Sequence, residues 1–144
     1  VCYRDYGGRW VYHTWQITTD PGTKSLKFPV NSKGTAILCP GQYLNSHQIG
    51  LHQGKYEALT QLSPVTVYRD NNKDNYLNLD PNRVFTGMFG INIHKAGLDS
   101  TLVENFSAGC QVFKRAKDFN EFLLLAKKHR KLYGNTFTLT LINE

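Results

Sequence analysis

Residues 90–94 read Gly-Ile-Asn-Ile-His, and residues 105–111 read Asn-Phe-Ser-Ala-Gly-Cys-Gln. The first stretch alternates apolar and polar side chains from Phe89 to His94, which predicts a β-strand with His94 at its end, on the face opposite the apolar one. The second stretch places small residues directly before Cys110, which favours a tight turn. We therefore expect a strand, a loop and a turn that bring a histidine close to a cysteine.

Cys110 has the chemistry of a nucleophile. The thiolate is the reactive form, and an ordinary thiol with a pKa of about 8.5 is only a few per cent ionised at pH 7. A histidine within hydrogen-bond reach, such as His94, can take the proton and lower the thiol pKa. Small residues at Ala108 and Gly109 would let the N–H groups of Gly109 and Cys110 point at a developing oxyanion. One short segment is thus predicted to supply nucleophile, base and oxyanion donors.

The order of these residues carries a family resemblance. His94, an intervening loop, the turn Ser107-x-Gly109-Cys110 and an apolar residue at Val112 resemble the signature of the YkuD-type L,D-transpeptidases. In that family a histidine on one strand serves a cysteine in a Ser/Thr-x-Gly-Cys turn. The resemblance therefore implies a YkuD-like fold and an enzyme that works through a cysteine.

The resemblance centres on residues 87–119, and the turn departs from it at Ala108, where the family usually has histidine. It implies that Cys110 attacks a carbonyl of a peptidoglycan stem peptide and forms a thioester, which then passes to an amine or to water. His94 would be the base, the backbone carbonyl of Lys95 would orient its ring, and no cofactor would be needed. The further site residues that it implies are Ser107 and Gly109 in the turn, and Asn92, Ala108 and Gln111 beside the substrate.

Two other functions stay open. The same fold can be a non-catalytic binding or structural module, for example in a phage particle, with Cys110 merely buried, and Ala108 in the turn favours this alternative. The chain could also be a basic nucleic-acid binder, but no nucleic-acid motif accompanies its charge, so we expect no specific nucleic-acid partner.

The length and net charge of the chain indicate the number of domains and the kind of partner. The chain has 144 residues, which suits one domain over residues 1–144. Its net charge of +6 favours anionic partners such as the polymers of the bacterial wall. No apolar run approaches 18 residues, so no membrane span is predicted. No signal peptide is recognisable, and a wall substrate would place the protein in the cell envelope or on a phage.

The patterning predicts an α+β fold that is mainly β, with one C-terminal amphipathic helix, arranged as a sandwich or barrel-like mixed sheet. We read residues 23–34 as a loop and predict no regular element over 42–54. Strands are predicted over residues 9–19, 35–39, 65–69, 89–94 and 136–141. Residues 56–61 are read as extended chain or a strand, and residues 112–113 either enter another strand or pack into the core.

The helix is predicted from a capping box formed by Asp118 and Glu121, and it runs to about Tyr133 before Gly134 ends it. Its apolar stripe recurs at positions i, i+3, i+4 and i+7. That stripe consists of Phe119, Phe122, Leu123 and Ala126.

The three cysteines leave at least one thiol free within a single chain. If the protein is exported, a disulfide between Cys2 and Cys39 is the pairing that leaves Cys110 free. Metal binding is not predicted, because His47 and His52 are five residues apart, whereas a helical metal pair is four apart. The alternative would be a zinc site from these two histidines with His94.

Overall fold

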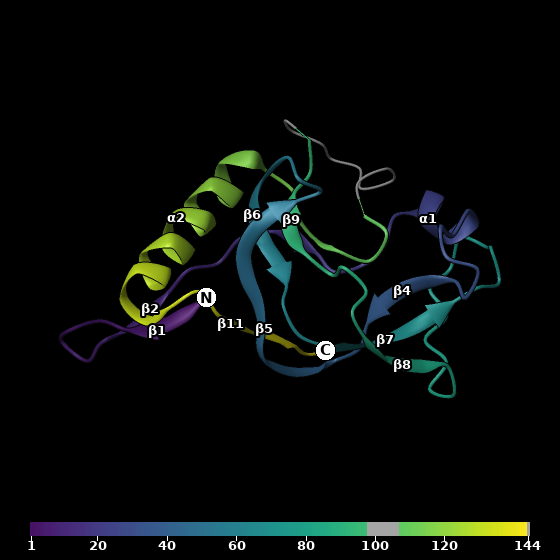
Figure 1. Cartoon of the computed structure of the whole chain (residues 1–144), viewed down its shortest axis with the longest axis horizontal. Coiled ribbons are helices and arrows are strands. Elements are labelled where there is room, and N and C mark those ends of the chain that lie inside the picture. The colour runs from purple at the N-terminus through teal and green to yellow at the C-terminus, as the bar shows by residue number, and fades with distance from the viewer. Residues whose placement is uncertain (98–106, 144) are drawn as a thin grey trace.

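The computed structural model describes residues 1–97 and 107–143 (Figure 1). These residues form three sheets and two helices. The strands are β1 (Cys2–Arg4), β2 (Trp10–Tyr12), β3 (Ile17–Thr18), β4 (Thr35–Leu38), β5 (Gly41–His52), β6 (Tyr56–Gln61), β7 (Val65–Asp70), β8 (Val84–Gly87), β9 (Ile93–Lys95), β10 (Gln111–Phe113) and β11 (Phe137–Leu141). The helices are α1 (Thr23–Lys27) and α2 (Ala116–Tyr133).

The main sheet has the strand order β11-β5-β6-β9-β10-β3. It is a mixed sheet, because β9 and β10 are parallel while the other neighbours are antiparallel. Figure 1 shows α2 alongside this curved sheet, the β1–β2 hairpin near the end of α2, and the small sheet β4-β7-β8 on the far side of the molecule. Among the described residues, 39% lie in strands and 17% in helices, so the prediction of a mainly β, α+β fold with one C-terminal helix is confirmed.

Two apolar clusters hold the fold together. The first joins α2 to the main sheet and contains the stripe residues Phe119, Phe122 and Ala126, with Leu123 partly buried at its edge, so the predicted apolar face of the helix is confirmed. The second lies under the small sheet and contains Ile91. Each fully buried aliphatic or aromatic side chain in such a cluster contributes about 1.5–3 kcal/mol.

Both ends of α2 are set by the backbone. Gly134 ends the helix at φ +99°, as predicted, and its N–H donates to the carbonyl of Arg130. The predicted capping box is wrong, because the N-cap is Arg115 and its side chain makes no capping hydrogen bond. Asp118 instead lies in the first turn, where it accepts a 3.0 Å hydrogen bond from Arg115 Nε and complements the helix dipole.

Several predicted boundaries differ from the structure. The strand expected over 89–94 forms only at Ile93–Lys95, and the one expected over 9–19 divides into β2 and β3. The loop expected over 23–34 contains α1. Residues 42–54, for which no element was predicted, lie largely within β5, the longest strand described. β5 pairs with both β11 and β6, so backbone hydrogen bonds on both edges stabilise a sequence with little apolar alternation.

Among the described residues, no helix is both long enough and apolar enough to cross a membrane.

Candidate active site

Cys110 lies directly before β10, beside the segment that leads into β9. The two strands are parallel, with Val112 paired to His94. The N–H of Asn92 points at Cys110 Sγ at 3.5 Å, and the thiol donates to the carbonyl of Gly90 at 3.4 Å. The sulfur therefore rests against the backbone of residues 90–92.

The turn before Cys110 is fixed by a serine and a glycine. Ser107 Oγ donates to the carbonyl of Cys110 at 2.8 Å and accepts the N–H of Gly109 at 3.1 Å. Gly109 has φ +119°, and a Cβ there would lie 2.1 Å from the carbonyl oxygen of Ala36 in β4. Only glycine fits this position, because it needs both a left-handed backbone and an absent side chain.

These bonds change the expected role of Gly109. Its N–H already donates to Ser107 Oγ, so in this state it is not directed at a substrate oxygen, contrary to the sequence-based expectation. The N–H of Cys110 itself forms no hydrogen bond with any other described residue. It is therefore the remaining oxyanion donor of the expected pair.

His94 is buried in β9, with only 4% of its surface exposed. Its Nδ1 lies 2.8 Å from the carbonyl oxygen of Lys95, the carbonyl that the sequence analysis singled out. A carbonyl can only accept, so Nδ1 carries the hydrogen and the neutral ring keeps its lone pair on Nε2. Tyr56 Oη lies 3.5 Å from the same Nδ1 and donates to the Lys95 carbonyl at 3.4 Å.

The sheet register relates His94 to Cys110. Val112 is paired with His94, and Cys110 precedes Val112 by two residues, so the two side chains share one face of the sheet. No hydrogen bond between His94 and Cys110 occurs in the described structure. The fold thus places the predicted base and nucleophile on adjacent strands without a direct bond in this state.

His52, at the end of β5, was considered from the sequence only as a zinc ligand, and the structure places it beside the proposed base. Its ring stacks on that of His94, with ring centres 4.1 Å apart and planes within 19°. The N–H of Gln61 donates to Asn92 Oδ1 at 2.9 Å, which turns Asn92 Nδ2 toward His52 Nδ1 at 3.1 Å. Since Nδ2 can only donate, His52 Nδ1 accepts, and the neutral ring carries its hydrogen on Nε2.

Burial keeps the rings neutral. It lowers the pKa of His94, and the hydrogen bond to the Lys95 carbonyl acts in the opposite direction with a smaller effect. The pKa of His52 falls to about 4 because of burial first, and then because of His94 and Lys55. Both imidazoles are therefore uncharged at pH 7, and His94 is in the form that can accept a proton.

The thiol is also neutral at rest. Burial raises the pKa of Cys110, while the N–H of Asn92 acts in the opposite direction. This overturns the expectation of a thiol pKa below the ordinary value. Burial also raises the pKa of the Tyr56 hydroxyl, with the nearby Cys110 as the second cause. The arrangement suits proton transfer during attack rather than a preformed thiolate.

The other predicted substrate contacts divide into two groups. Asn92 belongs to the network around Cys110, and Ala108 is exposed at the turn. Gln111 is only 3% exposed and pairs with Ile93, a member of the core cluster under α2. Its side chain alternates with that of Cys110 to the other face of β10. Gln111 therefore does not belong to the network around Cys110, and its contact with substrate stays a prediction.

Neither a metal site nor a disulfide is found in the described structure. In residues 1–97 and 107–143, no three His, Cys, Asp or Glu side chains gather as metal ligands. His47 is used differently, since its Nε2 binds the carbonyl of Ile91 at 2.9 Å. All three cysteines are free thiols, with Cys2 exposed and Cys39 buried, so the conditional disulfide between them is not formed.

Comparison with known proteins gave no match of this chain to a family model, to a curated protein or to a solved structure.

Proposed function

We propose that this chain is a cysteine acyltransferase or peptidase of the YkuD-type L,D-transpeptidase kind, acting on peptidoglycan stem peptides. One observation carries the proposal: the Lys95 carbonyl binds His94 Nδ1 at 2.8 Å, which leaves Nε2 as a base on the face of the sheet that carries Cys110. The Ser-x-Gly-Cys turn, held by Ser107 and by the glycine at φ +119°, supports it.

In the first half of the reaction, His94 Nε2 takes the Cys110 proton as Sγ attacks the peptide carbonyl carbon. The carbonyl oxygen becomes an oxyanion, which the N–H of Cys110 can stabilise. His94 then gives its proton to the nitrogen of the leaving amine, the C–N bond breaks, and a thioester remains on Cys110. The proton moves during attack because thiol and imidazole are both neutral at rest.

In the second half, an amine or a water attacks the thioester carbonyl. His94 removes the proton of the attacking group and returns it to the departing sulfur. Attack by an amine gives transpeptidation, and attack by water gives hydrolysis. No cofactor takes part in either route, and the net charge of +6 suits an anionic wall polymer. This substrate would place the protein in the cell envelope or on a phage.

A second function has specific support. The raised thiol pKa and the engagement of the Gly109 N–H by Ser107 suit a non-catalytic binding or structural module of the same fold. In such a module Cys110 is a buried thiol, as most unreactive cysteines are.

The test is turnover of purified peptidoglycan, followed by mass spectrometry of the released or joined stem peptides. The Cys110→Ala variant is expected to lose turnover while keeping its fold, and Cys2→Ala, which changes an exposed thiol, is the control that keeps it. A mass increase of the wild-type protein by one acyl group, absent in Cys110→Ala, would support the thioester. Equal turnover by wild type and Cys110→Ala would exclude the covalent mechanism, and no turnover by either would favour the module.

A further inference from the structure

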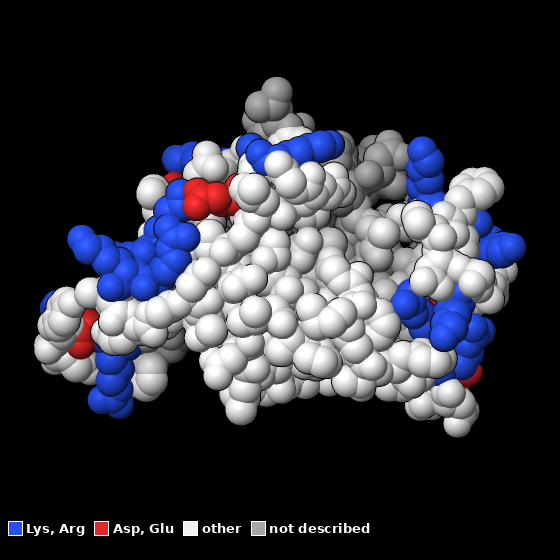
Figure 2. Space-filling view, in the orientation of Figure 1, with Lys and Arg blue, Asp and Glu red and all other residues white. Residues whose placement is uncertain are grey.

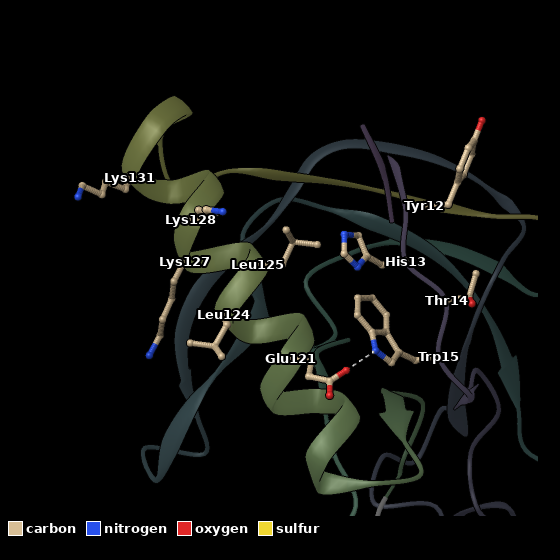
Figure 3. Close-up of a pocket in the computed structure, with 10 residues that line it drawn as sticks. All are labelled: Tyr12, His13, Thr14, Trp15, Glu121, Leu124, Leu125, Lys127, Lys128 and Lys131. Atoms are coloured by element: carbon tan, nitrogen blue, oxygen red, sulfur yellow. Dashed lines mark hydrogen bonds between the residues drawn. The ribbon is translucent and has the colours of Figure 1, made fainter. Parts of the chain in front are cut away.

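Lysines crowd the outer side of α2, next to a groove that no candidate active-site residue lines. Figure 2 shows Lys and Arg gathered over this side of the molecule and again at the opposite end. The groove lies between residues 12–15 and α2, and its volume is about 860 Å³ (Figure 3). A second hollow of about 650 Å³, beside the β1–β2 hairpin, shares Leu125 and Lys128 with it. We call the two neighbouring hollows together the trough along α2.

The wall opposite α2 is made of stacked rings. His13 stacks on Trp15 with centres 5.7 Å apart, and Tyr3 stacks on His13 at 5.8 Å. Trp15 also packs against Phe113 and Phe122. These stacks cover the rings of His13 and one face of Trp15, so bases of a single-stranded nucleic acid cannot stack there. The trough also has exposed tyrosines at Tyr6, Tyr12 and Tyr133, so binding of nucleic acid is one of the outcomes that the test below separates.

The charges in the trough are unbalanced. Two carboxylates line it. Glu121 accepts the indole N–H of Trp15 at 3.4 Å, and Figure 3 shows the two side chains directed at each other. Asp5 pairs with Arg9. Lys127 is paired with Glu57. Lys128 and Lys131 take part in no ion pair among the residues described, so the α2 side of the trough has two cations for an anionic occupant.

Apolar surface accompanies these cations. Leu125 points from α2 toward His13, and Leu124 is 68% exposed on the neighbouring flank (Figure 3). The stretch from residue 121 to residue 131 is about 15 Å long at 1.5 Å per residue. An extended peptide of about four or five residues has this length. The chemistry fits a short peptide that carries free carboxylates and small apolar side chains.

We propose that the trough along α2 binds a second stem peptide of the wall polymer and so holds the protein on its insoluble substrate. This inference rests on the proposed function for its choice of ligand. Lys128 and Lys131 pair with the carboxylates of the peptide, and Leu124 and Leu125 contact its methyl groups. Binding in the trough is separate from the chemistry at Cys110, because no residue is shared between the two sites.

The test is sedimentation with purified peptidoglycan, using Cys110→Ala protein so that nothing is consumed. Lys128→Gln/Lys131→Gln is compared with Lys24→Gln/Lys27→Gln, a matched pair of exposed lysines on α1. We expect the α2 double variant to bind peptidoglycan about tenfold more weakly than the parent protein, and the α1 double variant to bind as the parent does. Raising salt from about 50 to about 300 mM should weaken the binding of the α1 variant more than that of the α2 variant, because the α1 variant keeps Lys128 and Lys131. Thermal melting of both variants checks that they stay folded.

Equal binding by the two lysine pairs would overturn the inference. The inference would also be overturned if the protein bound DNA or anionic lipid vesicles through Lys128 and Lys131 but did not sediment with peptidoglycan. Turnover is measured separately on the protein with Cys110 intact. A chain that binds through the trough but shows no turnover therefore refutes the proposed reaction and leaves the binding site standing.

Discussion

The imidazole rings of His52 and His94 lie 4.1 Å apart and within 19° of parallel. The two residues come from β5 and β9, which are separated in the sheet by β6. The hydrogen bond from Asn92 places the ring hydrogen of His52 on Nε2, and the Lys95 carbonyl places the ring hydrogen of His94 on Nδ1. The proposed base is therefore held between a backbone carbonyl on one side and a neutral ring on the other.

This stack makes His52 a positioning residue for His94. His52→Ala should admit water to the ring and raise the pKa of His94 toward the ordinary value of about 6.5. His52→Phe keeps a flat ring in place, so the pKa of His94 should stay low. Turnover should fall on the order of tenfold to a hundredfold in the alanine variant, because the base loses its fixed orientation, and less in the phenylalanine variant.

The measurement is an NMR titration of the His94 ring, which needs no substrate. His129→Ala, a change on α2, is the control and should leave the titration as in wild type. Identical His94 titrations for wild type and His52→Ala would show that the stack has no bearing on the base.

The buried histidines should make the fold sensitive to acid. Burial is the first cause that lowers the pKa of His47, His52 and His94. Between each lowered pKa and about 6.5 the unfolded chain binds more protons, so stability is lost as pH falls through this window. With a folded pKa of about 4, His52 alone should reduce the free energy of unfolding by about 2 kcal/mol between pH 7 and pH 5.

Urea unfolding at pH 7, 6 and 5 measures this loss. The His52→Phe variant should show a smaller decline, since one of the titrating rings is gone. A free energy that stays constant from pH 7 to pH 5 would show that these rings are as accessible to protons in the folded state as in the unfolded one.

Cys110 should react as a half-buried neutral thiol. Its pKa is raised by burial, so iodoacetamide labelling should be slow at pH 7 and should rise only at alkaline pH. His94→Ala should admit water and move the labelling midpoint down toward the ordinary thiol value while it abolishes turnover. Labelling is followed by mass spectrometry in a Cys2→Ser background, which removes the exposed thiol.

The opposite pattern identifies a different mechanism. A wild-type midpoint near pH 6–7 that rises in His94→Ala would mean that a thiolate and an imidazolium already exist at rest. Such a result would support the pair of Cys110 thiolate and His94 imidazolium that the sequence alone suggested.

Local patterns in the sequence predicted those parts of the fold that depend on near neighbours. The stripe that includes Phe119 and Phe122 predicted the buried face of α2, and Gly134 predicted its end. The start of the helix was missed, because Arg115 adopts an extended backbone without any side-chain cap to announce it. β5 was missed because its pairing partners, β6 and β11, stabilise a polar strand that has no apolar period of its own.

The candidate site shows the same division. The sequence singled out His94, Cys110 and the Lys95 carbonyl, which lie close to one another along the chain or on paired strands. His52 was considered only as a metal ligand, because its contact with His94 depends on the order of β5, β6 and β9. The direction of the Cys110 pKa shift depends on burial, and burial is a property of the folded chain that no local motif records.

The turn before Cys110 gives the sharpest test of the site's architecture. Gly109→Ala meets two penalties, a backbone at φ +119° and a Cβ 2.1 Å from the Ala36 carbonyl oxygen. Gly134→Ala meets only the first, since φ is +99° and nothing lies within 4 Å. We expect Gly134→Ala to cost about 1 kcal/mol of unfolding free energy and Gly109→Ala about 3 kcal/mol or more, because β4 must shift. Urea unfolding of both variants measures the difference, and equal losses would mean that the Ser-Ala-Gly-Cys turn does not pack against β4.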